Sequence, residues 1–404
     1  MKTVVIGGGP SGMISAYYEK INGNDVVLIE KNEKLGKKLY ITGKGRCNLT
    51  NDCDVQTFLA NVVSNPKFLM SSIYAFTPTD TINFFENIGL KTKVERGNRV
   101  FPLSDKSSDV IKVLKTALES VGVEIKLNET VLDVASNNGA VNKVKTDLGE
   151  YLANKVIVAT GGISYPSTGS TGDGFKFAKS LGHTVTKLTP SLCGFNLKGE
   201  DYKELQGLTL KNVNLTLKDC DKEYYSEQGE MLFTHFGVSG PLVLTASALT
   251  TKRSLNNIKL YIDLKPALSV KELDKRLLRD FELNKNKAIK NSLDLLLPKA
   301  LIPLIIKKSG INEYKKNNEI TVKERSVLVS LLKNLEFKVE SLRGFNEAVV
   351  TNGGVSVKEI NPSTMESKIV KGLYFAGEVL DLDAFTGGFN LQIAFSTGYV
   401  AGNN

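Results

Sequence analysis

The chain has 404 residues, of which 41% are hydrophobic and 24% are charged, and this composition is typical of a globular protein of two or three domains. It contains no run of about 18 apolar residues, no signal-peptide pattern and no CxxC pair, so we expect a cytoplasmic protein with no membrane span and no metal. The formal net charge of +9 is compatible with a polyanionic partner such as RNA, although the lysines are spread along the whole chain.

The first 30 residues predict a β-α-β unit that binds a dinucleotide. A strand over 3–6 leads into a glycine-rich turn, a helix continues to about residue 22, and a second strand over 26–29 ends at Glu30. In the G-x-G-x-x-G spacing, Gly7 permits the tight turn, Gly9 lets a pyrophosphate approach the backbone, and Gly12 lets helix and strand pack closely. The helix N-terminus attracts phosphates, and Glu30 is placed to accept hydrogen bonds from ribose hydroxyls.

The segment 36–51, GKKLYITGKGRCNLTN, is glycine-rich, strongly cationic and contains the thiol of Cys47. Beside a nucleotide site, such a loop indicates redox chemistry; the simpler alternative is a solvated lysine loop. Nearby Lys44 and Arg46 are expected to lower the pKa of the Cys47 thiol, which would suit it to act as a general acid. A small buried side chain that only packs is an equally common role for a free cysteine, and both alternatives stay open.

The elements that follow alternate between helix and strand. We expect a helix over 108–121, strands over 124–127 and 130–135, a turn at 137–139, and strands over 141–146 and 155–159. The last of these strands ends at a second glycine turn, Thr160-Gly161-Gly162.

A change of pattern near residue 190 predicts an antiparallel β region followed by helices. Polar and apolar residues alternate over 208–217, 231–234 and 258–264. Capping boxes at Ser269/Glu272 and Thr321/Glu324 predict two helix starts, and we expect a further helix over 293–308. After residue 344 a strand over 372–376 leads to Gly377-Glu378, and a final helix opens at the TGGFNLQ motif (386–392) and ends near residue 402.

Three separate segments predict a single nucleotide site. They are the opening fingerprint, the turn at 160–162, and the Gly377-Glu378 turn with its following helix. This arrangement is typical of FAD proteins whose cofactor domain is built from both chain ends. The chain has no second G-x-G-x-x-G, so we expect no separate nicotinamide-binding domain.

Three motifs resemble those of the HI0933-like (YhiN/BaiN-like) flavoprotein family: GKKLYITGKGRCNLTN (36–51), FTHFGVSGP (233–241), and YFAGE (374–378) with TGGFNLQ (386–392). The resemblance covers essentially the whole chain. It implies an α/β fold: a Rossmann-type two-dinucleotide FAD-binding domain (1–190 and 345–404), an inserted antiparallel β-barrel (191–268 and 336–344) and a small helical domain (269–335).

On this resemblance and the motifs, we assign residues to the site. The residues expected to contact FAD are Gly7, Gly9, Ser11, Gly12, Glu30, Lys31, Lys38, Gly43, Arg46, Asn48, Val131, Thr160, Gly161, Gly377, Glu378, Gly388, Asn390 and Leu391. Val131 is included only because this strand usually gives its backbone to the adenine. Arg46, Cys47 and His235 are the catalytic candidates; His235 is placed for proton transfer, with a structural histidine as the alternative.

The resemblance implies several reactions and leaves the substrate open. The first expectation is an FAD-dependent reductase of a conjugated C=C bond in a small molecule, with NAD(P)H as a dissociable electron donor. Alternatives are dihydrouridine formation in ribosomal RNA, oxidation of a small amine with release of peroxide, and a flavin-binding protein without turnover. The sequence contains no basic-aromatic stripe typical of RNA-binding modules.

Overall fold

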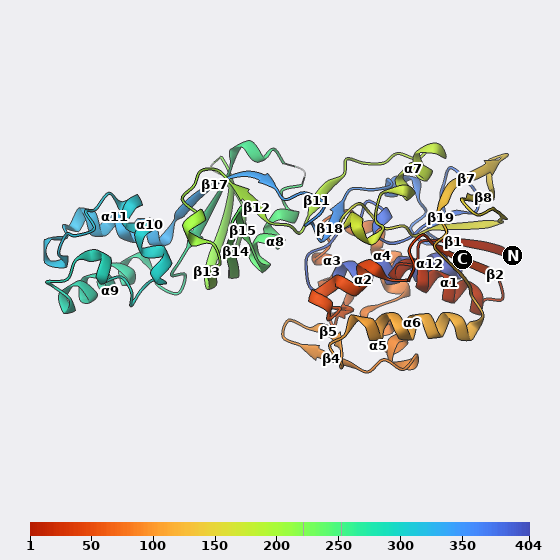
Figure 1. Cartoon of the computed structure of the whole chain (residues 1–404), viewed down its shortest axis with the longest axis horizontal. Coiled ribbons are helices and arrows are strands. Elements are labelled where there is room, and N and C mark those ends of the chain that lie inside the picture. The colour runs from red at the N-terminus through yellow and green to blue at the C-terminus, as the bar shows by residue number, and fades with distance from the viewer. Residues whose placement is uncertain (221, 252) are drawn as a thin grey trace. The chain divides into compact units, whose positions relative to one another are not determined.

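The computed structural model describes residues 1–220, 222–251 and 253–404, which form two compact units (Figure 1). Unit 1 consists of Met1–Ser191 and Gly344–Asn404, and unit 2 consists of Leu192–Arg343. Both ends of the chain therefore lie in unit 1, which is the α/β, Rossmann-type part of the protein. The finer division of unit 2, with 269–335 as a domain of its own, stays a prediction.

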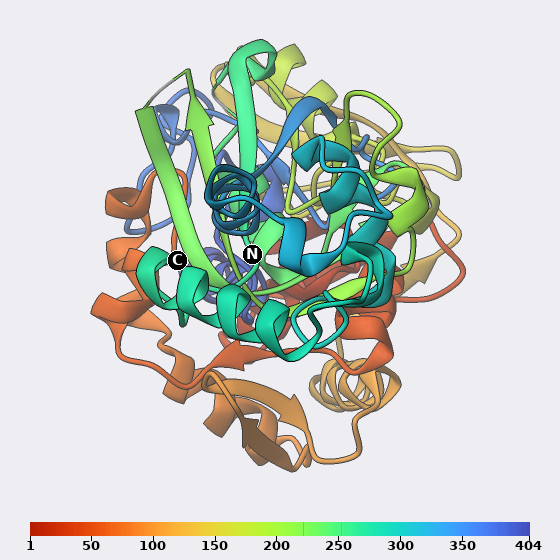
Figure 2. The same cartoon turned by 90° about the vertical axis from the view of Figure 1, so that its left-hand side faces the viewer.

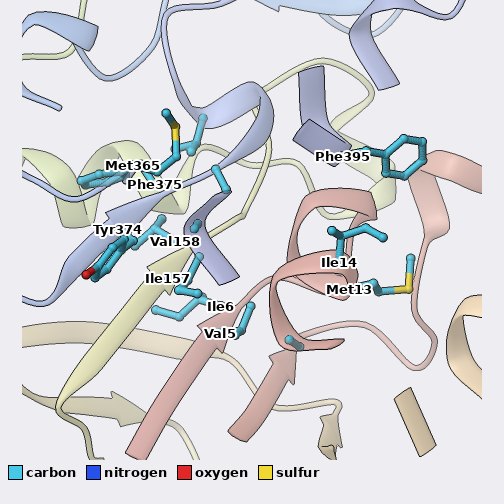
Figure 3. Close-up of a cluster of buried hydrophobic side chains, with 14 of the residues drawn as sticks. Val5, Ile6, Met13, Ile14, Ile157, Val158, Met365, Tyr374, Phe375 and Phe395 are labelled. Atoms are coloured by element: carbon cyan, nitrogen blue, oxygen red, sulfur yellow. The ribbon is translucent and has the colours of Figure 1, made fainter. Parts of the chain in front are cut away.

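The centre of unit 1 is a parallel sheet of five strands in the order β19-β10-β1-β2-β6. Their bounds are β1 (Lys2–Ile6), β2 (Asp25–Glu30), β6 (Glu124–Leu127), β10 (Lys155–Val158) and β19 (Leu373–Phe375). The inner strands are mostly apolar, and their buried valine, leucine and isoleucine side chains are typical of a parallel sheet that is covered on both faces. Figure 3 shows Val5 and Ile6 of β1 beside Ile157 and Val158 of β10, and all four side chains are buried.

Two helices from opposite ends of the chain pack against each other in unit 1. They are α1 (Pro10–Ile21) and α12 (Phe389–Asn403). A Cβ at Gly398 would lie 2.6 Å from the carbonyl oxygen of Ser11, so only glycine permits this approach. The Ser15 hydroxyl donates a hydrogen bond of 2.9 Å to the carbonyl of Gly398. The contact fixes the last helix against the glycine-rich turn at the start of the chain.

The remaining elements of unit 1 surround this core. The helices are α2 (Lys37–Ile41), α3 (Val55–Ala60), α4 (Pro66–Ala75), α5 (Pro78–Asn87), α6 (Ser107–Val121) and α7 (Asp173–Ser180). Three small sheets are β3 (Thr50–Asn51), β5 (Arg99–Pro102) and β4 (Thr92–Glu95); β7 (Val131–Asn137), β8 (Ala140–Thr146) and β9 (Glu150–Leu152); and β11 (Thr189–Ser191) with β18 (Val350–Asn352).

Unit 2 contains a closed antiparallel barrel in the order β12-β15-β14-β13-β16-β17. Its strands are β12 (Phe195–Leu197), β13 (Thr209–Asp219), β14 (Lys222–Thr234), β15 (Gly237–Ser239), β16 (Ile258–Asp263) and β17 (Leu335–Leu342). Alternation decides which side chains face inward: Ile258, Leu260 and Ile262 of β16 are buried, and the residues between them are half-buried. The predicted β-barrel is confirmed.

The α-helices in the described residues of unit 2 are α8 (Pro241–Ala248), α9 (Val270–Leu283), α10 (Ile302–Ser309) and α11 (Val322–Lys333). Helices α9, α10 and α11 gather at one end of the unit and face the viewer in Figure 2. Both predicted capping boxes are confirmed, at Ser269 with Glu272 and at Thr321 with Glu324. The prediction of one helix over 293–308 is wrong in its first half, because Pro298 disfavours a helical conformation at the residue before it, and α10 begins only at Ile302.

No helix in the described ranges is long and apolar enough to cross a lipid bilayer.

Candidate cofactor site

The predicted nucleotide segments meet at one edge of the parallel sheet. Strands β1, β2, β10 and β19 all end there, and they lead into the turns at Gly7, Lys31, Thr160 and Gly377. Backbone hydrogen bonds align the ends of neighbouring strands: the Ala159 N–H donates to the carbonyl of Ile6, and the Ala376 N–H donates to the carbonyl of Val158. In open α/β folds, ligands bind beyond the carboxyl ends of the strands, so this edge is the candidate cofactor site.

The turn between β1 and α1 has the geometry that the fingerprint predicts. Gly7 has φ +105°, and a Cβ there would lie 2.5 Å from the carbonyl oxygen of Ala159. A Cβ at Gly12 would overlap the Gly7 carbonyl, whereas at Gly9 the nearest atom is 4.0 Å away. No side chain caps the N-terminus of α1, which leaves its N–H groups, including that of Ser11, directed at the space beside Gly9. The turn therefore fits a phosphate group.

Glu30 ends β2 and is almost fully buried. Its carboxylate accepts hydrogen bonds from the N–H of Gly8 (2.8 Å) and from the N–H (2.8 Å) and side-chain amide (2.6 Å) of Asn32. The next residue, Lys31, lies with its ammonium 2.6 Å from the Asp173 carboxylate. Asn32 was not among the predicted residues, although its position two residues after the strand end was a usable signal.

Glu378 and Lys38 face each other in the site. The Lys38 ammonium lies 2.7 Å and 3.0 Å from the two Glu378 oxygens and 2.5 Å from the Ser164 hydroxyl. The same carboxylate accepts from Ser164 (3.0 Å) and from the N–H of Thr351 (2.8 Å). The positive charge of Lys38 is thus balanced within the protein. Sequence reasoning missed Ser164, whose closeness to the turn at 160–162 was a signal, and Thr351, for which no local signal exists.

The turns at Thr160 and Gly377 lie on either side of this pair. Gly161 has φ +71°, and a Cβ there would approach Glu378 Oε2 to 3.9 Å. A Cβ at Gly377 would lie 2.5 Å from the Ser11 hydroxyl, so the C-terminal turn touches the first helix. The Thr160 hydroxyl is buried without a hydrogen-bond partner in the described residues, but it lies against Gly174 of α7 and so is no evidence for a ligand.

The segment 36–51 forms α2 and a tight loop instead of a free lysine loop. Gly43, Lys44 and Cys47 all have φ +58°, a left-handed conformation that costs energy for the two non-glycine residues. Arg46 lies 4.3 Å above the ring of Phe101 and pairs with Glu95 and Asp105, each at 2.5 Å. These carboxylates, from β4 and the turn after β5, hold the guanidinium, so its contact with a flavin stays a prediction.

The thiol of Cys47 is fully buried in the core of unit 1. Burial raises the pKa of the Cys47 thiol to about 12, and a hydrogen bond with Thr42 opposes this only in part. The predicted lowering of this pKa by Lys44 and Arg46 is therefore wrong, because the loss of solvation on burial is the dominant effect on the thiolate. The burial favours the alternative in which Cys47 only packs.

Next to Cys47, the side-chain oxygen of Asn48 is buried and has no hydrogen-bond partner among the described residues. Buried polar atoms almost always have a partner, so this oxygen is available to a donor that the protein itself does not supply. Together with the open face of Gly9 and the uncapped α1, it shows that the residues present fit a dinucleotide such as FAD.

The last helix begins next to this loop. Gly388 has φ +100°, and a Cβ there would overlap the backbone of Thr50, so the two segments are in contact. The Asn390 side chain is used locally: its amide donates to Ala384 at 2.8 Å and its oxygen accepts from the same residue at 2.9 Å. Leu391 is half-buried. No side chain caps the N-terminus of α12, so its N–H groups remain available to a ligand.

Two further assigned residues, Val131 and His235, come from other segments of the chain. Val131 begins β7 with its side chain buried, and its backbone contact with adenine stays a prediction. His235 belongs to unit 2, in the exposed turn between β14 and β15, with its ring edge-on to Phe236 at 5.1 Å. The described residues include no group of three or more His, Cys, Asp or Glu side chains that would hold a metal ion.

Comparison with known proteins finds a family model and relatives that match nearly the whole chain. Residues 1–404 match the family model described as HI0933-like protein Rossmann domain. The chain is 31% identical over 405 residues to the 3-dehydro-bile acid delta(4,6)-reductase of Clostridium scindens, covering 98% of this chain and 97% of that protein. It is also 31% identical over 410 residues to the ribosomal RNA dihydrouridine synthase of Haemophilus influenzae, covering 98% and 96%.

Among solved structures, the chain resembles 3-ketosteroid-delta4-(5alpha)-dehydrogenase from Rhodococcus jostii. The TM-score is 0.53 at 15% identity, and the match covers 99% of this chain and 95% of that one. At this identity the likeness concerns the fold alone.

Proposed function

The chain belongs to the HI0933-like family and is a flavin-dependent oxidoreductase, and we propose that it reduces a conjugated C=C bond, with NAD(P)H as the dissociable electron donor. One observation carries the proposal: two relatives, each 31% identical over nearly the whole chain, are named a delta(4,6)-reductase and a dihydrouridine synthase. Formation of dihydrouridine from uridine is itself the saturation of a C=C bond next to a carbonyl, so one chemistry accounts for both names.

The site offers FAD a distinct contact for each of its parts. The N–H groups at the start of α1 would bind the pyrophosphate, and Glu30 would bind the adenosine ribose. The turns at Gly161 and Gly377 would contact the rest of the FAD molecule. Bound FAD supplies hydride transfer. The N-terminus of α12 would then favour negative charge on the ring system.

Saturation of a C=C bond also needs a proton on the second carbon. Cys47, Arg46 and His235 remain the proposed sources. The Cys47 thiol is buried and very weakly acidic, and the Arg46 guanidinium is held by two carboxylates. His235 is exposed, and histidine is the side chain that enzymes use most often for proton transfer, so it is the favoured donor of the three.

The test begins with the purified full-length protein. We expect a yellow protein. NADH or NADPH should bleach its flavin absorbance in the absence of oxygen, and a 3-oxo-4-ene steroid acid should then restore it. The variant His235→Gln should keep the bleaching step and slow the restoration step. If neither nicotinamide bleaches the bound flavin, the reductase proposal fails; peroxide release with a small amine and no nicotinamide would support an oxidase instead.

A second candidate substrate is uridine in ribosomal RNA, and the distribution of charge favours it. Residues 269–335 contain 15 Lys and Arg against 8 Asp and Glu, a net charge of +7, out of +9 for the whole chain. A small apolar substrate gives no reason for this concentration, whereas a polyanion does. Mass spectrometry of ribosomal RNA from a deletion strain tests it: loss of one dihydrouridine supports this substrate, and unchanged modification excludes it.

A further inference from the structure

Two lysine- and asparagine-rich segments of unit 2 are held side by side. They are NKNKAIK (284–290) and NEYKKNN (312–318), and we call them together the lysine patch. The backbone pairs Ala288 with Lys316 in antiparallel fashion, and the N–H of Ile289 donates to the carbonyl of Lys315 at 2.9 Å. The buried Asn317 donates to the carbonyl of Asn284 at 2.9 Å, which locks the two segments together. The pairing thus brings together five lysines from two separate segments of the sequence.

Some of these lysines are paired with carboxylates and others are not. Lys285 pairs with Glu282 at 2.8 Å, and Lys315 pairs with Glu324 at 2.7 Å. The ammonium groups of Lys287 and Lys316 are exposed, and neither forms an ion pair within the described ranges. The patch therefore presents two positive charges that no carboxylate of the described residues compensates, on two segments whose backbones are hydrogen-bonded to each other.

An exposed aromatic ring lies within the patch. Tyr314 is 67% exposed, and the Lys290 ammonium lies 3.7 Å from the centroid of its ring. A tyrosine supported from one face by a cation leaves its other face free to stack with a base. Single-stranded RNA is recognised by this combination of phosphate contacts and stacking on aromatic rings.

A hollow of about 820 Å³ adjoins the patch and shares Lys290 and Glu313 with it. Its apolar lining comes from three isoleucines of α10 and the loop after it, Ile302, Ile306 and Ile311. Its polar lining includes Lys299 and Lys307, and also the carboxylates of Asp294 and Glu313. Carboxylates repel phosphates but accept hydrogen bonds from the amino groups of bases, so the hollow suits an unstacked base and the patch suits the phosphates.

We propose that the lysine patch and the adjoining hollow form a docking surface for single-stranded RNA. This inference rests on the second candidate function, in which ribosomal RNA is the substrate, and names the surface that would hold it. The net charge of +7 in residues 269–335 supplies the attraction, and the partly apolar hollow with its carboxylates distinguishes an RNA strand from a plain anionic surface.

The test measures binding without turnover. The FAD-loaded full-length protein is titrated into a fluorescein-labelled single-stranded RNA of mixed sequence, at potassium chloride concentrations from about 50 to 200 mM. In the double variant Lys287→Ala/Lys316→Ala, we expect about tenfold weaker binding and a salt dependence reduced by about 1.4 in log–log slope, about 0.7 for each lost phosphate contact. Tyr314→Ala should weaken binding with no change in this slope, because it removes stacking only.

A matched control removes two exposed lysines from unit 1, Lys112→Ala/Lys145→Ala, neither of which forms an ion pair in the described residues. The control should bind RNA as the parent does. Equal binding by the patch variant and the control overturns the inference, as does lysine-dependent binding to phosphatidylglycerol vesicles with no binding to RNA. RNA binding without any dihydrouridine formation supports the docking surface but excludes the second candidate function. Dihydrouridine formation at full rate in the patch variant supports the second candidate function but excludes the docking surface.

Discussion

The substitution Gly12→Ala tests the glycine turn most directly, because it adds one methyl group where the structure has no space. The new Cβ would overlap the carbonyl oxygen of Gly7 and lie 3.1 Å from its carbon and 3.3 Å from the Cβ of Ala159. All three atoms belong to the sheet edge or its turn, and none is the end of a flexible side chain. Helix α1 must therefore move away from β1 by about 1 Å to restore ordinary contact.

Two opposing effects determine how much Gly12→Ala lowers the free energy of unfolding. Overpacking at a site that cannot relax destabilises the folded protein by about 3 kcal/mol, and replacing glycine with alanine in a helix stabilises it by about 1 kcal/mol. The net loss of about 2 kcal/mol corresponds to a melting temperature about 5 °C lower for a unit of this size. The displaced N–H groups of α1 should also weaken FAD binding at least tenfold, or about 1.4 kcal/mol.

Thermal melts and fluorescence titration of FAD into the apoprotein measure both effects. Gly149→Ala is the matched control, because nothing lies within 4 Å of its Cβ position and its φ is not in the left-handed region. The control should melt and bind FAD as the parent does. A Gly12→Ala protein with the melting temperature and FAD affinity of the parent would refute the close contact between α1 and the turn.

Three further predictions follow from buried or paired groups. Iodoacetamide should leave Cys47 unlabelled in the folded protein and label the exposed Cys220, as read by mass spectrometry, and a Cys47→Ala variant should keep its rate of flavin reduction. Burial opposes ionisation of Asp173, but hydrogen bonds, the strongest from Lys31, lower the pKa of its carboxyl from 3.8 to about 2. The parent should therefore be more stable than Asp173→Asn at pH 7, and this difference in the free energy of unfolding should vanish as the pH falls from about 4 to 2. Lys155→Met leaves Glu19, its fully buried partner, without a counter-charge and should lower the free energy of unfolding by about 3–5 kcal/mol in denaturant melts, whereas adding Glu19→Leu should recover most of it.

Local signals in the sequence predicted the parts of the site that depend on local physics. The fingerprint glycines, both capping boxes and the Asn138-Gly139 hairpin turn, with φ +50° and +76°, all lie where their patterns predict. Each is decided by sterics or by hydrogen bonds within a few residues, so a short window contains all the information. The first half of the helix predicted over 293–308 is wrong for a local reason as well, because Pro298 disfavours a helical conformation at the residue before it.

The electrostatic surroundings of the assigned side chains could not be predicted in this way. Arg46 and Cys47 were both interpreted from their immediate neighbours in a basic segment. The fold instead brings Glu95 and Asp105 to Arg46 from residues about 50 and 60 positions away, and it buries the Cys47 thiol in the core. The sign of a pKa shift depends on burial and on such distant partners, which the spacing of residues does not contain.

The sequence by itself determined the parallel-sheet cofactor fold, its construction from both chain ends and an inserted antiparallel β region, because strand patterns and glycine turns are local. That this region forms a barrel was implied only by the family resemblance. Only the tertiary structure decided which charges face one another. It paired Lys38 with Glu378 across 340 positions and joined two lysine-rich segments of unit 2 into one surface. Contacts of this kind arise when distant segments are packed together, and their energies depend on distance and solvent exposure, which become defined only in the folded chain.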